Sequence, residues 1–309
     1  MDGSIASPRP FLALGIRLVT AFALATMGML VKLGGERGVH LFEMIFWRQA
    51  ITLVLIGGGL LLLGKLATVR TTRLGAHSRR AALGLVGMMF TYGTVLLLPL
   101  AEATTINFTT PFFAVFLAVI LFGEKVGFYR WAAVAVGFCG VIVLVQPGSS
   151  AGVNILGVVV GLIASAMVAL ISFQIQDLNK TESPWAIIFW FTLLSTPVIA
   201  LALPFVFTAH TAETWAILVA MSVCGAMAQI LLTTSLRFGS AAVILLMDYT
   251  SLLWATWYGY AVFDRAAPAS LWLGAPLIIG AGVLIAWRER QLARARMQPV
   301  AEPEPPARA

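Results

Sequence analysis

Two oppositely charged residues lie deep inside apolar stretches of this chain. Arg48 stands about eight residues into the stretch 41–63, roughly 12 Å along a helix, and Asp248 lies at a similar depth in the stretch 241–262. A charge at such a depth is costly and usually faces a protein interior or a water-filled cavity. We interpret Arg48 as an anchor for an anion or a carboxylate, and Asp248 as its counter-ion or as a proton-coupling group. The alternative is a structural ion pair that joins two helices.

The start of the apolar stretch 104–122 is unusually polar. Four threonines and Asn107 precede or adjoin Pro111, and a proline leaves one backbone carbonyl unpaired and bends a helix. Neighbouring hydroxyl groups can satisfy the freed carbonyl. We therefore predict that Pro111 is a hinge and that Asn107 lines a cavity. The alternative is helix packing through small polar residues.

Aromatic residues lie inside the apolar stretches rather than at their ends, where a membrane-interface belt would place them. Such rings can stack on a flat organic substrate, or they can fill a core. Gln229 is the deepest glutamine within an apolar stretch, so it is a further candidate for a cavity wall. The aromatic candidates for substrate contact are Trp47, Tyr92, Trp190 and Tyr249.

The composition requires a membrane to position these residues. Of 309 residues, 60% are hydrophobic and 11% are charged, with a mean hydropathy of +0.94. Soluble domains contain roughly 45–50% apolar residues. The net charge of +7 suits lipid headgroups and cytoplasm better than nucleic acid, because the basic residues flank apolar blocks. Cys139 and Cys224 lie inside such blocks, so we expect no disulfide framework, metal or cofactor.

The apolar blocks predict an all-α integral membrane fold with ten transmembrane helices. Each block is near the length of about 20 residues that spans a hydrocarbon core. The tail 298–309, rich in Pro, Glu and Ala, is predicted to be disordered. The predicted spans are 11–33, 41–63, 82–100, 104–122, 128–145, 155–175, 185–205, 214–236, 241–262 and 271–287.

Lysine and arginine set the predicted orientation. With both termini inside, fifteen basic residues lie at cytoplasmic segments and three, Lys32, Arg37 and Arg265, lie outside. We expect Arg17, Lys32 and Glu43 to anchor span ends at the membrane interface. We therefore predict a multi-pass protein of a bacterial inner membrane with both termini in the cytoplasm. The fifteen are Arg9, Lys65, Arg70, Arg73, Arg79, Arg80, Lys125, Arg130, Lys180, Arg237, Arg288, Arg290, Arg294, Arg296 and Arg308.

The second half of the chain repeats the first. The pattern of Ala101–Pro147 returns in Ser240–Ala286, where GAGVLIA stands in place of GFCGVIVL. Ile-Phe-Trp at 45–47 recurs at 188–190, with an offset of 143, and Asn107 aligns with Asp248 at an offset of 141. Because each half has five spans, an odd number, the second half enters the membrane from the opposite face. We predict two inverted repeats, 11–147 and 153–288, as in many secondary transporters.

The two repeated pairs, TTINFTTPFFAVFLAVILFGEKVGFYRWAAVAVGFCGVIVLVQP and VILLMDYTSLLWATWYGYAVFDRAAPASLWLGAPLIIGAGVLIAWRER, resemble the tandem EamA domains of the drug/metabolite transporter superfamily. The resemblance extends from about Phe11 to Arg290. It implies two inverted five-helix halves, a central substrate cavity and transport without ATP hydrolysis, inward or outward. Glu124 follows a glycine, whereas the second copy reads Phe263-Asp264 without one, so strict symmetry is not expected.

Two classes of function remain. The first is a secondary-active carrier of small organic metabolites (amino acid-, nucleoside- or vitamin-like), with proton coupling and a homodimer left open. The second is a membrane-embedded enzyme acting on a lipid-linked substrate, which would need a cluster of acids, bases or metal ligands. His40, His77 and His210 are predicted to lie in loops, and no span holds paired acids. The absence of a Gly-rich Lys-Ser/Thr phosphate loop argues against nucleotide use. We favour the carrier, with the lipid bilayer and a metabolite as its partners.

Overall fold

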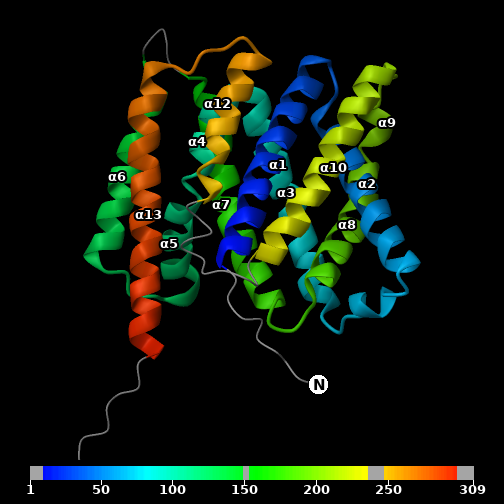
Figure 1. Cartoon of the computed structure of the whole chain (residues 1–309), viewed down its shortest axis with the longest axis horizontal. Coiled ribbons are helices and arrows are strands. Elements are labelled where there is room, and N and C mark those ends of the chain that lie inside the picture. The colour runs from blue at the N-terminus through cyan, green and yellow to red at the C-terminus, as the bar shows by residue number, and fades with distance from the viewer. Residues whose placement is uncertain (1–9, 149–152, 236–246, 298–309) are drawn as a thin grey trace, which may run out of the picture.

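The computed structural model describes residues 10–148, 153–235 and 247–297. Within these ranges the regular structure is entirely helical, and the helices stand side by side as one bundle (Figure 1). The predicted disordered tail, 298–309, and the start of the ninth predicted span, 241–246, lie outside the described residues.

Most helices match the predicted spans within a few residues. In the first half they are α1 (Pro10–Glu36), α2 (Leu41–Leu62), the 3-10 helix η1 (Leu66–Val69), α3 (Leu74–Leu97), α4 (Leu100–Asn107), α5 (Thr110–Phe122) and α6 (Phe128–Val145). In the second half they are α7 (Ile155–Leu178), α8 (Pro184–Ala200), α9 (Leu203–Val206), α10 (Ala212–Ser235), α12 (Ser251–Ala261) and α13 (Ala269–Met297).

The all-α membrane architecture is confirmed. Eight segments of the described chain are long and apolar enough to cross a membrane, counting α4 and α5 as one, and the 17-residue α8 is a shorter apolar helix. The count of ten stays a prediction, because the ninth predicted span is described only from residue 247.

The third span begins earlier than predicted. His77, Arg79 and Arg80 interrupt the apolar pattern, so the sequence placed them in a loop, but α3 begins at Leu74 and contains all three. Arg79 is exposed, whereas His77 and Arg80 are buried in the protein. The loop position predicted for His77 and the flanking position predicted for Arg80 are therefore wrong. One face of this first turn packs inward, and hydropathy averaged over a window does not resolve faces.

Helix neighbours come in matching pairs. α1 packs against α10 as α7 packs against α3, and α2 packs against α10 as α8 packs against α3. α1 also contacts α12 as α7 contacts α4, while α2–α8, α4–α12 and α6–α13 pair with each other. Exchanging α1, α2, α3, α4 and α6 for α7, α8, α10, α12 and α13 leaves this set of neighbours unchanged.

Two opposite ends of the bundle are named from here on. The near end is where α1 begins and the far end is where it ends, at the bottom and the top of Figure 1. A far-end cavity is lined by Lys32, near the end of α1, and by Asn154, which caps the start of α7. The first helices of the two halves therefore run in opposite directions.

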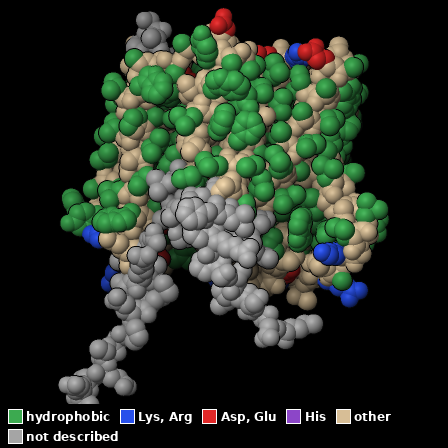
Figure 2. All heavy atoms as spheres, viewed as in Figure 1, with side chains coloured by type: hydrophobic (Ala, Val, Ile, Leu, Met, Phe, Trp, Pro, Cys, Tyr) green, Lys and Arg blue, Asp and Glu red, His purple; other side chains and the backbone are tan. Residues whose placement is uncertain are grey.

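Apolar side chains cover the outside of the bundle. Figure 2 shows them over most of the height of one face, with the charged side chains gathered toward the two ends. Exposed examples are Leu62 at 88%, Phe128 at 81% and Phe205 at 87%. In water such a surface would be strongly unfavourable, so it is the surface that faces lipid.

α6 and α13 pack closely along each other at the left of Figure 1. A Cβ atom on Gly140 would lie 2.9 Å from the Gly274 carbonyl oxygen, and one on Gly274 would lie 2.7 Å from the Gly140 carbonyl oxygen. Only glycine at both positions allows this approach, which is how small residues hold membrane helices together.

Candidate functional site

The predicted fourth span is broken between α4 and α5, at Phe108 and Thr109. Pro111 has no amide proton to donate to the Asn107 carbonyl, and the Thr110 hydroxyl donates to that oxygen instead, at 2.7 Å. The Thr109 hydroxyl likewise donates to the Ile106 carbonyl at 2.7 Å. A hydroxyl thus takes the place of the missing amide donor at the interruption before Pro111. A gating role for this interruption stays a prediction.

The ninth span carries the same break without a proline. Residues 249 and 250 form a turn before α12. The Thr250 hydroxyl donates to the Met247 carbonyl and the Ser251 hydroxyl donates to the Asp248 carbonyl, both at 2.6 Å. These bonds fall at an offset of 141 from those of Thr109 and Thr110. The two breaks are therefore built from equivalent hydrogen bonds.

The two breaks lie against each other. α4 contacts α12, and the rings of Phe108 and Tyr249, also 141 residues apart, meet edge to face with their centroids 4.8 Å apart. The Asn107 side-chain oxygen is buried without a hydrogen-bond partner. Three of the predicted site residues, Asn107, Asp248 and Tyr249, are thus brought together with Pro111 at one place between the halves.

Asp248 has a partner other than the predicted one. Arg17 of α1 donates from Nε to Oδ1 at 2.6 Å and from Nη2 to Oδ2 at 2.5 Å, in a bidentate ion pair. The predicted pairing of Asp248 with Arg48 is therefore wrong. Interfacial anchoring of Arg17 is wrong too, because this side chain is 7% exposed and faces the protein.

Arg48 lies in a different part of the bundle. Its Nη1 atom donates to Gln49 Oε1 at 3.2 Å and to Met88 Sδ at 3.0 Å. Tyr92 of α3 lies close enough for the Arg48 charge to act on it. The Gln49 amide in turn donates to the Ser195 hydroxyl of α8. Gln229 is half-buried on α10, one turn beyond Gly225, whose backbone faces Arg48. Arg48 thus lies between α2, α3 and α10, with Tyr92 on α3 and Gln229 on α10.

A far-end cluster joins the loop after α1 and the start of α2 to the start of α10. It consists of Arg37, Glu43, Trp47, His210 and Glu213. Arg37 forms an ion pair with Glu213 at 2.5 Å, and this hydrogen bond raises the pKa of Arg37 above its ordinary value. His210 Nε2 and Glu43 Oε1 are 2.7 Å apart and almost fully buried. Trp47 donates to Glu43 at 3.3 Å within α2, so interfacial anchoring of Glu43 is also wrong.

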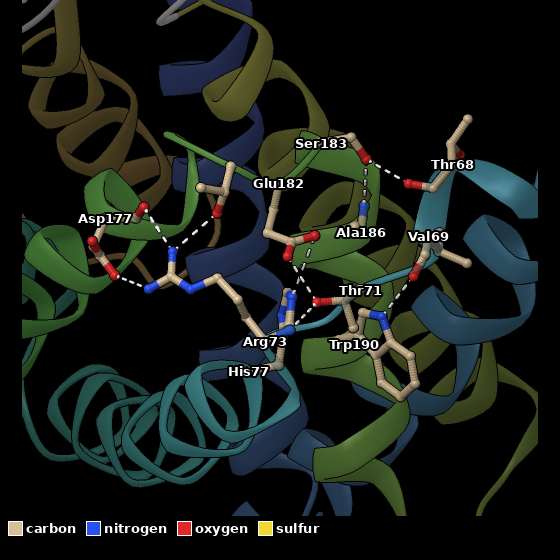
Figure 3. A network of polar contacts seen from close by, with 11 residues as sticks. Thr68, Val69, Thr71, Arg73, His77, Asp177, Glu182, Ser183, Ala186 and Trp190 are labelled. Carbon is tan, nitrogen blue, oxygen red and sulfur yellow. Dashed lines mark hydrogen bonds and ion pairs between the residues drawn. The ribbon is translucent and has the colours of Figure 1, made fainter.

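A near-end cluster joins the segment before α3 to the end of α7 and the start of α8 (Figure 3). Arg73 forms an ion pair with Asp177 at 2.5 Å and donates to the Thr181 hydroxyl at 3.0 Å. The Thr71 hydroxyl donates to Glu182 at 2.7 Å, and Trp190 Nε1 donates to the Val69 carbonyl at 2.8 Å. The buried His77 lies 3.9 Å from Glu182.

The predicted aromatic repeat thus places its two tryptophans in opposite clusters. Trp47 stacks edge to face on Trp215, with ring centroids 4.8 Å apart, and Trp190 lies 6.1 Å from the His77 ring. Neither tryptophan lies at the helix breaks. Substrate contact by either one stays a prediction.

Two adjoining cavities, of about 620 and 520 Å³, open at the far end. Lys32, Leu97, Pro99 and Arg265 line both. Lys32 is 8% exposed and donates to the carbonyls of Val95 at 3.2 Å and Leu98 at 2.8 Å. Pro99 cannot donate to Val95, so the lysine replaces a missing amide. Interfacial anchoring of Lys32 is therefore wrong as well.

With this geometry established, comparison with known proteins identifies the class. Residues 11–146 match the EamA-like transporter family. A riboflavin transporter from Rhizobium johnstonii is 30% identical over 230 residues, covering 74% of this chain and 76% of that protein. The chain belongs to the EamA-like transporter family of the drug/metabolite transporter superfamily, which answers the enzyme alternative in favour of transport.

Other relatives are named for different solutes. A pseudopaline exporter from Pseudomonas aeruginosa is 25% identical over 87% of this chain and 94% of its own length. An S-adenosylmethionine uptake transporter from Rickettsia prowazekii is 26% identical over 82% of this chain and 85% of its own. A solved crystal structure that is 17% identical superposes with a TM-score of 0.60 over 89% of this chain and 98% of the other, so the fold is already known.

Proposed function

We propose that this protein is a secondary-active transporter that moves a small organic metabolite by alternating access between two inverted five-helix halves, 11–147 and 153–288. The observation that carries the proposal is the pair of facing helix breaks with equivalent hydrogen bonds. Discontinuous helices at a repeat interface are where transporters bind substrate and coupling ions. The matched helix neighbours support the same two halves.

The two polar clusters supply the alternating closure. Each one bridges the halves, and each lies at a different end of the route past the helix breaks. Opening one cluster while the other stays closed exposes the route to one side at a time. The ion pairs of both clusters are intact, and this fits a conformation in which neither end is fully open.

The proposed setting is a bacterial inner membrane with the near end in the cytoplasm. The bias of lysine and arginine toward near-end segments supports it. A cysteine introduced at Thr72, in the exposed near-end segment before α3, tests the orientation in intact cells. Labelling by a membrane-impermeant reagent added outside the cells would show that the near end faces outward, and would contradict the proposed orientation.

The transport itself is tested by comparing metabolite pools in cells with and without the protein, followed by uptake of the responding solute into proteoliposomes. We expect saturable, ATP-independent movement. Riboflavin and S-adenosylmethionine are the first solutes to assay, because relatives are named for them. Accumulation that needs ATP and no ion gradient would contradict the proposal.

A matched pair of variants tests the helix break. Thr110→Val leaves the Asn107 carbonyl without a donor, and at about 1 kcal/mol per lost hydrogen bond we expect uptake to fall roughly fivefold. Thr91→Val removes a similar bond, to Gly87 at 2.8 Å, from the unbroken helix α3. Uptake by Thr91→Val should stay near that of the wild type. Equal loss in both variants would show that the break has no special role.

A further inference from the structure

Two arginines are buried between α2, α3, α8 and α10 with donor atoms that have no partner. Arg48 on α2 is 9% exposed and Arg80 on α3 is 4% exposed. The Nε atoms of both, and Nη1 of Arg80, are buried without a hydrogen-bond partner. Arg80 lies over the Phe191 ring, 4.3 Å from its centroid. A guanidinium has five donors, so most of the hydrogen-bonding capacity of Arg80 goes unused.

No carboxylate neutralises this pair within the described part of the chain. The ion pairs recorded there engage Arg17, Arg37, Arg73, Arg130 and Lys180, and none reaches Arg48 or Arg80. The charge that acts on Arg80 is that of Arg48, which has the same sign. Burying two like charges without a counter-ion is costly, so it needs a reason beyond packing.

The surrounding helices make room for these side chains. A Cβ atom on Gly84 would collide with Arg80 Nη1 and the Phe191 ring, and one on Gly225 would lie 2.9 Å from Arg48 Nε. The Gln49–Ser195 hydrogen bond orients the amide whose oxygen accepts from Arg48. The site is therefore built around both guanidinium groups.

We infer that Arg48 and Arg80 form a binding site for an anionic group of the transported solute, either a carboxylate or a phosphate. Guanidinium groups bind both anions in a planar, bidentate geometry. The inference rests on the proposed function, because the anion is taken to belong to the solute. His77 lies one turn below Arg80 on α3, and Trp190 adjoins Phe191, so the near-end cluster closes over this site.

Anion-dependent stabilisation tests the site without a transport assay. The full chain is placed in nanodiscs of phosphatidylcholine, and its unfolding temperature is followed while sodium phosphate or sodium succinate replaces sodium chloride at constant ionic strength. We expect a saturable rise of about 3 °C with at least one of the two. The arm that responds at lower concentration identifies phosphate or carboxylate as the preferred group.

Matched variants locate the effect. Arg48→Gln and Arg80→Gln should lose the anion-dependent rise, while Arg37→Gln, at the exposed far-end pair, should keep it. In the absence of added anion, Arg80→Met should unfold at a higher temperature than the wild type, because it removes an unpaired buried charge. A purely structural arginine would give the opposite sign.

Two results would overturn the inference: no saturable rise with either salt in the wild type, or a rise that survives in both Gln variants. The outcome is separable from that of the transport proposal. An anion response without movement of any solute would end the transport proposal and leave the site. Transport of neutral or cationic solutes with no anion response would do the reverse.

Discussion

The near-end and far-end clusters occupy equivalent places in the two halves, but their charges are placed differently relative to the helix dipoles. At the far end, Glu213 lies in the first turn of α10 and Arg37 follows the end of α1, as helix dipoles favour. At the near end, Arg73 directly precedes the start of α3 and Asp177 lies in the last turn of α7, so both charges oppose the dipole of their own helix.

For the alternating closure proposed above, this reversal predicts that the two ends close with unequal stability. At the near end, Arg73 reaches the C-terminal end of α7, where its Nη1 atom also donates to the Asp177 carbonyl at 3.4 Å. The dipole of α7 therefore stabilises the Arg73 charge, which the dipole of its own helix, α3, destabilises. At the far end the dipole of its own helix already stabilises each charge, so pairing with the neighbouring helix adds less stabilisation. The near end also carries more hydrogen bonds across the halves. We therefore expect the near end to be the harder one to open.

The largest expected effect is at the buried acid of the far-end cluster. Glu43→Leu leaves His210 and Trp47 Nε1 without an acceptor, at about 1–3 kcal/mol for each group stranded in the interior. We expect a clear fall in the unfolding temperature of the purified protein. The double variant Glu43→Leu with His210→Leu should recover part of it. A double variant less stable than Glu43→Leu alone would show that loss of the Glu43–His210 pair is not the cause of the destabilisation.

The next effect concerns near-end closure. Thr71→Val with Trp190→Phe removes two bonds that cross between the halves, so at about 1 kcal/mol each we expect the open population to rise roughly thirtyfold. Maleimide labelling of Met88→Cys, beside Arg48, measures this once Cys139 and Cys224 are replaced by alanine. Trp47→Phe is the control, because the Trp47 bond stays within α2. Equal labelling in both would contradict an unequal closure.

A charge exchange sharpens the dipole argument. Arg73→Glu with Asp177→Arg keeps an ion pair but places each charge as its own helix prefers. We expect near-end opening to increase by roughly threefold in the same labelling assay, since the neighbouring helix no longer contributes to closure. An unchanged or lower rate would show that helix dipoles play no part.

The smallest effect is at the exposed far-end pair. Arg37 and Glu213 are 30% and 71% exposed, and such pairs are screened by salt. Arg37→Gln should shift the unfolding temperature by less than about 2 °C, and the shift should vanish at high salt. A larger, salt-independent loss would place this pair among the main determinants of far-end closure.

Much of this arrangement follows from the sequence where one residue determines the local structure. Phe128–Val145 was predicted at its observed bounds, because glycines and a proline punctuate the apolar run. Pro111 revealed the first break. The second break has no proline. Leu252 stands at the position equivalent to Pro111 and donates its amide to the Tyr249 carbonyl, so only the repeat points to this break.

The pairing of charges could not be predicted in the same way. Residue number gives the depth of Arg48 and Asp248 along the membrane normal, but not the direction in which each helix faces. α1 packs beside α12 and α2 packs beside α8 and α10, so Arg17 reaches Asp248 and Arg48 does not. Arg80 was missed because the exposed Arg79 beside it ended the apolar window. His77 and Arg80 are three residues apart, which is the spacing of one helix face, and that spacing was the available signal.

The glycine contact between α6 and α13 limits which helices can move in the proposed transport cycle. Two backbones in register at Gly140 and Gly274 cannot slide or tilt past one another without breaking that contact. Within the described residues, their other main contacts are with α4 and α5. In the proposed alternating-access mechanism we therefore expect α6 and α13 to stay together as one unit while the remaining helices rock.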